Sequence, residues 1–167
     1  MKVGVIVGRF QVPRLHPGHC YLIDEACKRF DKVLVFVGVT KYNKLTSHDP
    51  LPFEARKIML LEHNPNLIIY PIKDIGDWVA WIDKLNEMIG CACTLEYLNN
   101  PEIFIFGSRD SVVDNYKKSP NGIYNTMYLE SLEDYSGTIE RDKIINQYHP
   151  IWNYESRALL TWFSGNI

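Results

Sequence analysis

The sequence has no apolar run near the ~20 residues that a membrane-spanning helix requires. It also has no large excess of one charge, because 18 Lys and Arg face 20 Asp and Glu, for a net charge of −2. That balance disfavours a highly basic nucleic-acid-binding protein. The short apolar run at the N-terminus is broken by Gly4 and followed by Arg9 rather than by the cleavage site of an export signal. We therefore expect a cytoplasmic protein with neither membrane nor nucleic-acid partners.

Cysteine is scarce, and its spacing is not that of a metal site. Cys91 and Cys93 are separated by one residue, whereas zinc knuckles and thioredoxin-like sites have two between their cysteines. Cys20 and Cys27 are seven residues apart and would share one face of a helix. We expect reduced, structural thiols and no protein-bound metal centre.

Two phosphate-binding fingerprints are also missing. The chain contains neither Gly-x-Gly-x-x-Gly, which binds dinucleotides, nor the Gly-Lys-Ser/Thr of the P-loop. The loop from Gly8 to His19 contains no lysine at all. P-loop kinase chemistry is therefore disfavoured.

The composition that is present indicates one globular domain over residues 1–167, with 46% apolar and 23% charged residues. The charge is unevenly distributed. Residues 1–60 carry ten basic and five acidic side chains, net +5, and residues 61–167 carry eight and fifteen, net −7. An anionic ligand is therefore expected at the first third of the chain.

Apolar periodicity predicts alternating strands and helices. The predicted strands are Lys2–Val7, Lys32–Val39, Leu67–Ile72, Glu102–Phe106 and a short one within Tyr124–Leu129. The predicted helices are Gly18–Phe30, Phe53–His63, Trp78–Ile89 and helical pieces from Thr138 with a break at Pro150. This order predicts an α/β fold, a parallel sheet of about five strands with helices on both faces.

In such a sheet the ligand binds outside the carboxyl ends of the strands. The segment after the first strand reads Gly8-Arg9-Phe10-Gln11, followed by His16-Pro17-Gly18-His19 at a helix start. Free N–H groups and the helix dipole make that start a phosphate site, to which both histidines can add donors. A metal-binding histidine pair and a simple helix cap with surface histidines are the alternatives.

A second candidate phosphate segment, Ser136-Gly137-Thr138-Ile139-Glu140-Arg141, lies late in the chain. Two hydroxyls, a glycine and a helix start suit a phosphate, with Arg141 about one turn further on. An ordinary helix N-cap explains the same residues equally well.

Taken together, these segments resemble the nucleotidyltransferase superfamily with the HxGH motif. The resemblance is closest to nicotinamide mononucleotide adenylyltransferases of the archaeal type and to the adenylyltransferase domain of bifunctional Nudix proteins. Three further segments are similar to that family and follow in the same order: Ser47-His48-Asp49-Pro50-Leu51-Pro52-Phe53-Glu54-Ala55-Arg56, Pro71-Ile72-Lys73-Asp74-Ile75 with a tryptophan after it, and Gly107-Ser108-Arg109-Asp110. The resemblance covers roughly residues 2–145.

The chain departs from the family at two places. Four residues separate Gln11 from His16 where the family usually has two, so the loop must bulge. The segment between Asp74 and the tryptophan is shorter than in the archaeal pattern, so either Trp78 or Trp81 could be the ring that stacks on nicotinamide. Both tryptophans could instead be core residues of a helix.

The resemblance implies a Rossmann-like nucleotidyltransferase fold and the transfer of the adenylyl group of ATP to nicotinamide mononucleotide, giving NAD and pyrophosphate. It implies that His16, His19, Arg9 and Arg141 act on the phosphates. Mg²⁺ would be carried by the ATP phosphates. The ATP site would further include Gly8, Phe10, Gly18, Gly107, Ser108, Arg109, Ser136, Gly137 and Thr138.

On the acceptor side, the resemblance implies Asp74, Arg56, Ser47 and one of the two tryptophans. Arg56 could instead be a surface arginine of its helix. Two other functions stay open: the same fold with another acceptor, such as phosphopantetheine or a polyol phosphate, and a non-catalytic nucleotide-binding module. Residues 146–167 are predicted to form a helical tail too short for a fused Nudix hydrolase, so a stand-alone enzyme and possible homo-oligomer is expected.

Overall fold

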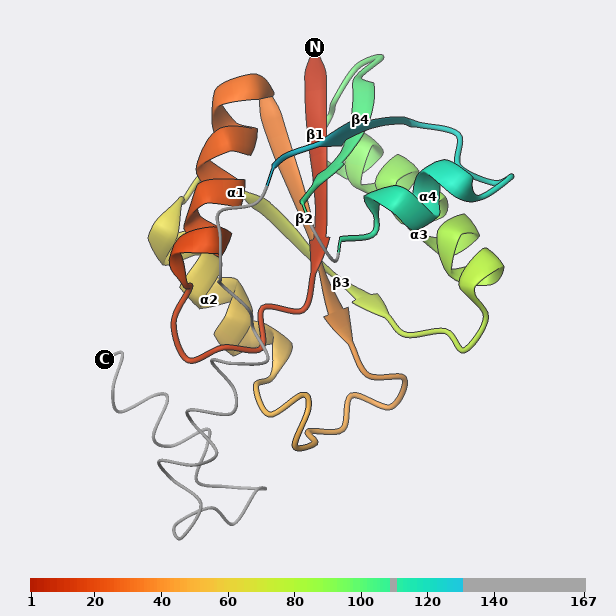
Figure 1. Ribbon diagram of the computed structural model, residues 1–167. Helices are drawn as coiled ribbons and strands as arrows, with labels where there is room; N and C mark the ends of the chain where they lie inside the picture. Colours follow the sequence, from red (N-terminus) through yellow and green to blue (C-terminus); the bar gives the residue numbers. More distant parts are fainter. Residues whose placement is uncertain (109–110, 131–167) are drawn as a thin grey trace, which may run out of the picture.

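A computed structural model describes residues 1–108 and 111–130. These residues form a five-stranded parallel sheet in the order β3-β2-β1-β4-β5, with helices on both faces (Figure 1). The strands are β1 (Lys2–Gly8), β2 (Lys32–Val39), β3 (Ile68–Lys73), β4 (Glu102–Gly107) and β5 (Asn125–Tyr128). The helices are α1 (Pro17–Arg29), α2 (Phe53–His63), α3 (Trp78–Leu95) and α4 (Val113–Lys118).

The central strands are apolar because both of their faces are covered. Seven of the eight residues of β2 are buried, and valine occupies four of those positions. A strand covered on both faces needs apolar side chains at successive positions rather than at alternate ones. β3 is an edge strand, where Pro71 can be accommodated without breaking an interior ladder.

Two apolar cores lie on opposite faces of the sheet. Ile23 of α1 and Leu60 of α2 pack in one core, and Ile82 of α3 and Tyr116 of α4 pack in the other. The chain therefore builds β1, β2 and β3 outward in one direction, then returns through α3 to β4 on the other side of β1 (Figure 1). The change of direction between β1 and β4 is a topological switch point, where open α/β sheets bind ligands.

The predicted fold class is confirmed, and four strands and three helices lie within one or two residues of their predicted starts. Two differences remain among the described residues. The third helix runs to Leu95, six residues beyond its predicted end, and α4 was not predicted. α4 has six residues and follows a serine-rich loop, so it carries too few turns for an apolar period to be visible. The helical pieces predicted from Thr138, and the tail 146–167, lie outside the described residues.

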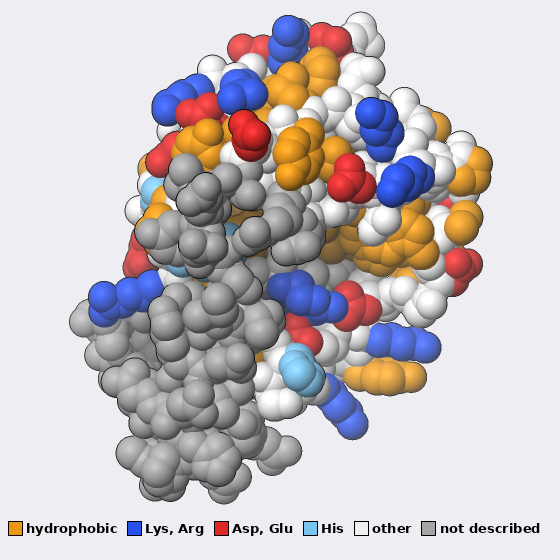
Figure 2. Space-filling view, viewed as in Figure 1, with side chains coloured by type: hydrophobic (Ala, Val, Ile, Leu, Met, Phe, Trp, Pro, Cys, Tyr) orange, Lys and Arg blue, Asp and Glu red, His pale blue; other side chains and the backbone are white. Residues whose placement is uncertain are grey.

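Within residues 1–108 and 111–130, no helix is long and apolar enough to cross a membrane. All four cysteines are free thiols. The described surface mixes both signs of charge, while hydrophobic side chains gather over α3 and α4 (Figure 2).

Candidate active site

A cavity of about 470 Å³ opens at the switch point, beyond the carboxyl ends of β1 and β2. The register places Gly8 at the end of β1 beside Val37 of β2, and Gly38 beside Ile72 of β3, so the three strands end together. Five residues predicted from sequence line this cavity: Gly8, Arg9, Asp74, Trp78 and Trp81. The rest of its lining is Val7, Gly38, Ile75, Ser111, Val112 and Asn115.

Arg9 is the cation of this cavity, and two carboxylates hold it. Its Nη1 lies 2.7 Å from Oδ1 of Asp49, and its Nη2 donates to Oδ2 of Asp74. Partial burial alone would lower the pKa of Arg9, but the hydrogen bonds and negative charges of Asp74 and Asp49 outweigh burial and raise it. Arg9 is therefore charged at all working pH values, and its guanidinium is fixed from two sides.

His16 and His19 lie at the start of α1, where Pro17 takes the first helical position. Nδ1 of His16 accepts a hydrogen bond from the backbone N–H of His19, at 3.2 Å. His16 therefore caps α1, while its ring is half-buried and not on the surface as the helix-cap alternative had it. Because Nδ1 is an acceptor here, a neutral His16 has its proton on Nε2 and can donate there.

The two imidazole rings stack, with centroids 3.6 Å apart and planes 17° from parallel. Burial, with the neighbouring His16 as the second cause, lowers the pKa of His19 to about 3. His19 is therefore neutral at pH 7. Its Nδ1 is buried and has no hydrogen-bond partner among the described residues.

The loop after β1 is held at its start by Phe10 and Gln11. Phe10 adopts a positive φ of 51°, and its ring lies 5.0 Å from that of His19. The side chain of Gln11 is buried and forms two hydrogen bonds with Leu51, at 2.9 Å to its N–H and 3.0 Å to its carbonyl oxygen. Further along this loop, Pro13 is exposed.

Arg56 is buried, with only 2% of its surface exposed, so the surface-arginine alternative is wrong. Its Nη1 donates to the carbonyl oxygens of Arg9 and Gly38, at 2.7 and 2.6 Å, and its Nε donates to Pro52, at 3.3 Å. Burial lowers the pKa of Arg56 to about 10, so it stays charged at neutral pH. Its observed contacts join strand ends and loops. The predicted substrate contact of Arg56 stays a prediction.

The two tryptophans of α3 differ in exposure. The rings stack, with centroids 5.1 Å apart and planes 12° from parallel. Trp81 is 8% exposed and belongs to the core beneath α3, whereas Trp78 is 44% exposed. The core alternative is thus confirmed for Trp81, and Trp78 presents the more accessible ring to the cavity.

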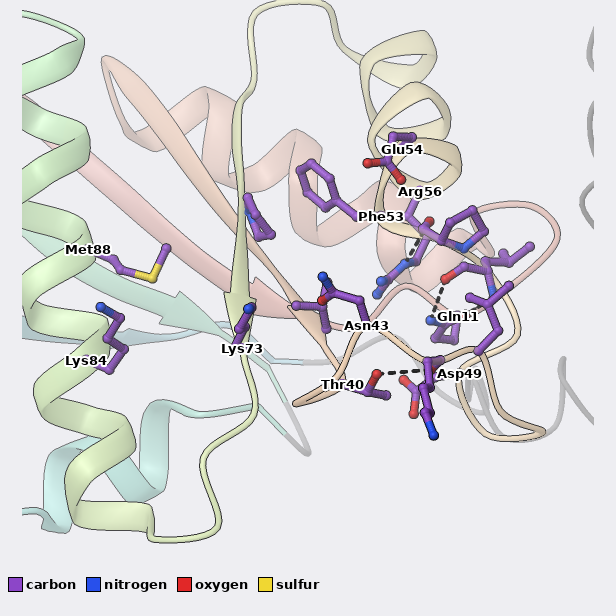
Figure 3. A pocket seen from close by; sticks show the side chains of 16 residues that line it. Gln11, Thr40, Asn43, Asp49, Phe53, Glu54, Arg56, Lys73, Lys84 and Met88 are labelled. Atoms are coloured by element: carbon purple, nitrogen blue, oxygen red, sulfur yellow. Dashed lines mark hydrogen bonds between the residues drawn. The ribbon is translucent and has the colours of Figure 1, made fainter. Parts of the chain in front are cut away.

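A second cavity, of about 600 Å³, lies between the loop after β2, the start of α2 and the edge of β3 (Figure 3). Lys44, Lys73, Lys84 and Arg56 make its lining predominantly basic, against Asp49 and Glu54. Asp49 therefore belongs to this cavity while its carboxylate binds Arg9 of the first one.

The remaining predicted residues are more scattered. Ser47 is exposed in the loop before α2. Gly107 ends β4, where a Cβ would come within 2.6 Å of the Ser111 side chain, and the carbonyl oxygen of Ser108 accepts a hydrogen bond from Ser111. Gly18 lies in the first turn of α1. Outside the described residues lie Arg109, Ser136, Gly137, Thr138 and Arg141.

Sequence reasoning did not select several residues that the fold brings to the site. Asp49 was quoted only as part of a similar segment, and Gln11 only as part of a motif. Ser111, Val112 and Asn115 line the first cavity from the loop and helix after β4. Their position after a strand end was a usable signal, because ligands bind there.

Comparison with known proteins shows which family this chain belongs to. Residues 5–143 match the cytidylyltransferase-like family. The chain belongs to that family.

As a cytidylyltransferase-like protein, it is similar to two proteins named nicotinamide-nucleotide adenylyltransferase. The first, from Pyrobaculum aerophilum, is 28% identical over 95 residues, or 53% of this chain and 52% of the relative. The second, from Pyrobaculum arsenaticum, is 30% identical over 94 residues, or 52% and 51%. The chain spans about half the length of the curated relatives it matches.

Solved structures agree on the nucleotidyltransferase fold. A bifunctional NMN adenylyltransferase/ADP ribose pyrophosphatase from Francisella tularensis, solved with AMP and a manganese ion, superposes with a TM-score of 0.71. It is 25% identical, over 87% of this cytidylyltransferase-like chain and 42% of its own. The NadR protein in complex with NAD and AMP-PNP has a TM-score of 0.60 at 20% identity, over 90% and 43% of the two chains, and supports the fold alone.

Proposed function

We propose that this protein transfers the adenylyl group of ATP to nicotinamide mononucleotide, forming NAD and pyrophosphate. The observation that carries the proposal is the cavity at the switch point. It combines a fixed guanidinium at Arg9 with an exposed indole ring at Trp78. A phosphate needs such a cation, and a flat nicotinamide ring needs such a stacking surface. The similarity to proteins named nicotinamide-nucleotide adenylyltransferase supports the same assignment.

The reaction joins the 5′-phosphate of the mononucleotide to the α-phosphorus of ATP. The acceptor is already an anion, so no general base is needed and no covalent intermediate with the protein is invoked. Catalysis then depends on aligning two phosphates and stabilising the charge of a five-coordinate phosphorus. Arg9 is proposed to bind phosphate oxygens. From the start of α1, His19 as a neutral ring and His16 are proposed to donate to the same oxygens.

Mg²⁺ is proposed to arrive with ATP and to neutralise part of the triphosphate charge. Asp49 and Asp74 are the carboxylates nearest to Arg9 and are ion-paired to it, so the proposal assigns the metal no ligand there. Arg141, Ser136 and Thr138 keep their predicted roles on the triphosphate as part of the proposal.

The proposal is tested by incubating the purified chain with ATP, Mg²⁺ and nicotinamide mononucleotide and measuring NAD. Parallel reactions offer phosphopantetheine with ATP, and a polyol phosphate with CTP. NAD and pyrophosphate formed in equal amounts are the expected result. Turnover of another phosphate ester without NAD formation would show that the acceptor is that ester and not nicotinamide mononucleotide. Nucleotide binding without any turnover would point to a non-catalytic module.

A further inference from the structure

We infer that Asp49 is a positioning residue for Arg9, a role that rests on the proposed function of the first cavity. Asp49 lies 40 residues from Arg9 in sequence, in the loop between β2 and α2. Its Oδ1 accepts a hydrogen bond from Nη1 of Arg9 at 2.7 Å, while Asp74 accepts from Nη2. The two carboxylates engage different nitrogens of one planar group, which fixes both its direction and its rotation.

The backbone around Asp49 is held on both sides. On one side Asp49 forms a closed turn with Thr46, in which each residue's N–H donates to the other's carbonyl oxygen, at 3.0 and 3.2 Å. The Thr46 hydroxyl accepts a further bond from the N–H of Asp49, at 3.0 Å. On the other side Gln11 binds both backbone groups of Leu51. A carboxylate on this anchored segment can therefore hold a partner in a defined place.

The backbone of Arg9 is tied to the same segment. Arg56 donates through Nη1 to the carbonyl oxygen of Arg9 and through Nε to that of Pro52, which lies three residues after Asp49. Both ends of the Arg9–Asp49 ion pair thus belong to one hydrogen-bonded unit. The side-chain contact adds direction to a distance that the backbone already fixes.

Asp49 and Asp74 hold Arg9 from different places. Asp74 lines the same cavity as Arg9, and 41% of its side chain is exposed. Asp49 has 15% of its side chain exposed and lines the second, basic cavity (Figure 3). A ligand entering the first cavity would meet Asp74 directly, whereas Asp49 would act through Arg9.

The test compares Asp49→Ala and Asp49→Asn with Arg9→Lys and with the double variant Arg9→Lys/Asp49→Ala. Loss of one anchor lets the guanidinium leave its place, so kcat of Asp49→Ala should fall about tenfold or more, with a smaller change in the KM for ATP. Asp49→Asn retains a hydrogen-bond acceptor without the charge, so its kcat should lie between those of the wild type and of Asp49→Ala. In the Arg9→Lys background, Asp49→Ala should lower kcat little further, because the two residues act as a unit.

Glu54→Gln is the matched control. Glu54 lines the same basic cavity and is also a carboxylate, but its side chain forms no ion pair with Arg9. Its kcat should stay near that of the wild type. A fall in kcat equal to that of Asp49→Ala would mean that the charge of the basic cavity matters rather than the position of Arg9, and would overturn the inference.

A second measurement does not depend on the reaction. Side-chain NMR of the arginine guanidinium groups reports rotation about the Nε–Cζ bond in the ligand-free protein. Rotation at Arg9 should be slow in the wild type and in Glu54→Gln, and clearly faster in Asp49→Ala. Unchanged rotation, or equal losses of kcat in the two Arg9 backgrounds, would overturn the role of Asp49. A wild type that makes no NAD but shows the change in rotation would refute the proposed function and leave the positioning of Arg9 by Asp49 standing.

Discussion

His19 lies under two constraints that oppose its protonation. Its ring is partly buried, with Nδ1 fully so, and the ring of His16 stacks on it with centroids 3.6 Å apart. Burial leaves a charge on His19 poorly solvated and His16 adds an unfavourable interaction with it, so the pKa of His19 falls to about 3. In the ligand-free protein His19 can therefore serve as a neutral donor through one ring nitrogen at a time, and not as a cation.

The lowered pKa of His19 predicts a pH dependence of stability. The unfolded chain protonates this residue near its ordinary value of 6.5 and the folded chain near 3, so the unfolded state binds more protons between these values. The contribution of neutral His19 to the free energy of unfolding is fully present above pH 6.5 and falls as the pH drops toward 3. At pH 5 this loss amounts to about 2 kcal/mol.

Urea unfolding at pH 8 and pH 5 should show the wild type losing about that much more than His19→Gln. His48→Gln, at an exposed histidine, is the control and should follow the wild type.

The two tryptophans predict different defects. Trp78→Ala should leave the fold intact and raise the KM for nicotinamide mononucleotide about tenfold, since it removes an exposed stacking ring. Trp81→Ala should lower the free energy of unfolding by about 3 kcal/mol or more, because it empties part of the core. Steady-state kinetics and urea unfolding on both variants check this. Trp78→Phe keeps an aromatic face and should retain most of the affinity. An unchanged KM in Trp78→Ala would show that this ring does not bind the acceptor.

At the scale of elements, one loop and one helix organise the site. The loop between β2 and α2 is fixed to the loop after β1 through Gln11, and the first turns of α2 supply Arg56. Arg56 donates to the carbonyl oxygens of Arg9 and Gly38, which follow or end neighbouring strands. A buried charge is tolerable here because these main-chain acceptors replace part of its lost hydration.

Removing these donors should destabilise the whole unit. Arg56→Met retains an unbranched side chain but leaves the carbonyl groups of Arg9 and Gly38 without this donor, and should lower the free energy of unfolding by about 3 kcal/mol. Urea unfolding measures the change. Lys28→Met, at an exposed lysine of α1, should leave the unfolding midpoint nearly unchanged. An Arg56→Met variant as stable as the wild type would show that other groups or water satisfy the carbonyl oxygens.

At the scale of the whole molecule, the sheet order decides where the first cavity lies. The strands all run in one direction, and the chain reverses its building direction between β1 and β4. Segments far apart in sequence therefore contribute to one cavity: the end of β1 and the loop after it, Gly38 near the end of β2, and the segments after β3 and β4. Ligands at this edge contact several elements at once and should stabilise the fold as a unit.

This predicts a shift of the thermal unfolding midpoint. A ligand that binds only the folded state stabilises it by about 2.7 kcal/mol at a concentration of 100 times Kd. ATP with Mg²⁺ and nicotinamide mononucleotide should each raise the midpoint of the wild type, measured by circular dichroism. The shift with the mononucleotide should be smaller in Trp78→Ala. The absence of any shift with either compound at millimolar concentration would contradict binding at this edge.

The fold class was predictable because its signals are local. The strand Lys32–Val39 and the helix Phe53–His63 have the predicted bounds, since apolar runs and helical periods are visible in a few consecutive residues. The short α4 offers no such period. The loop motif was selected from sequence by its residue types and its place after a strand end, whereas Asp74 and the tryptophan pair were selected through the resemblance to the family. Arg9, Asp74, Trp78 and Trp81 all line the first cavity.

By itself, the sequence determined the alternation of strands and helices, the edge of the sheet where the first cavity lies and the residue types available there. Only the tertiary structure decided which tryptophan is buried, that Arg56 binds backbone carbonyl groups, and that Asp49 and Asp74 share Arg9. These outcomes depend on contacts between residues 18 to 65 positions apart. Sequence periodicity reports which face of an element is buried, whereas partner choice depends on which segments the sheet order brings together.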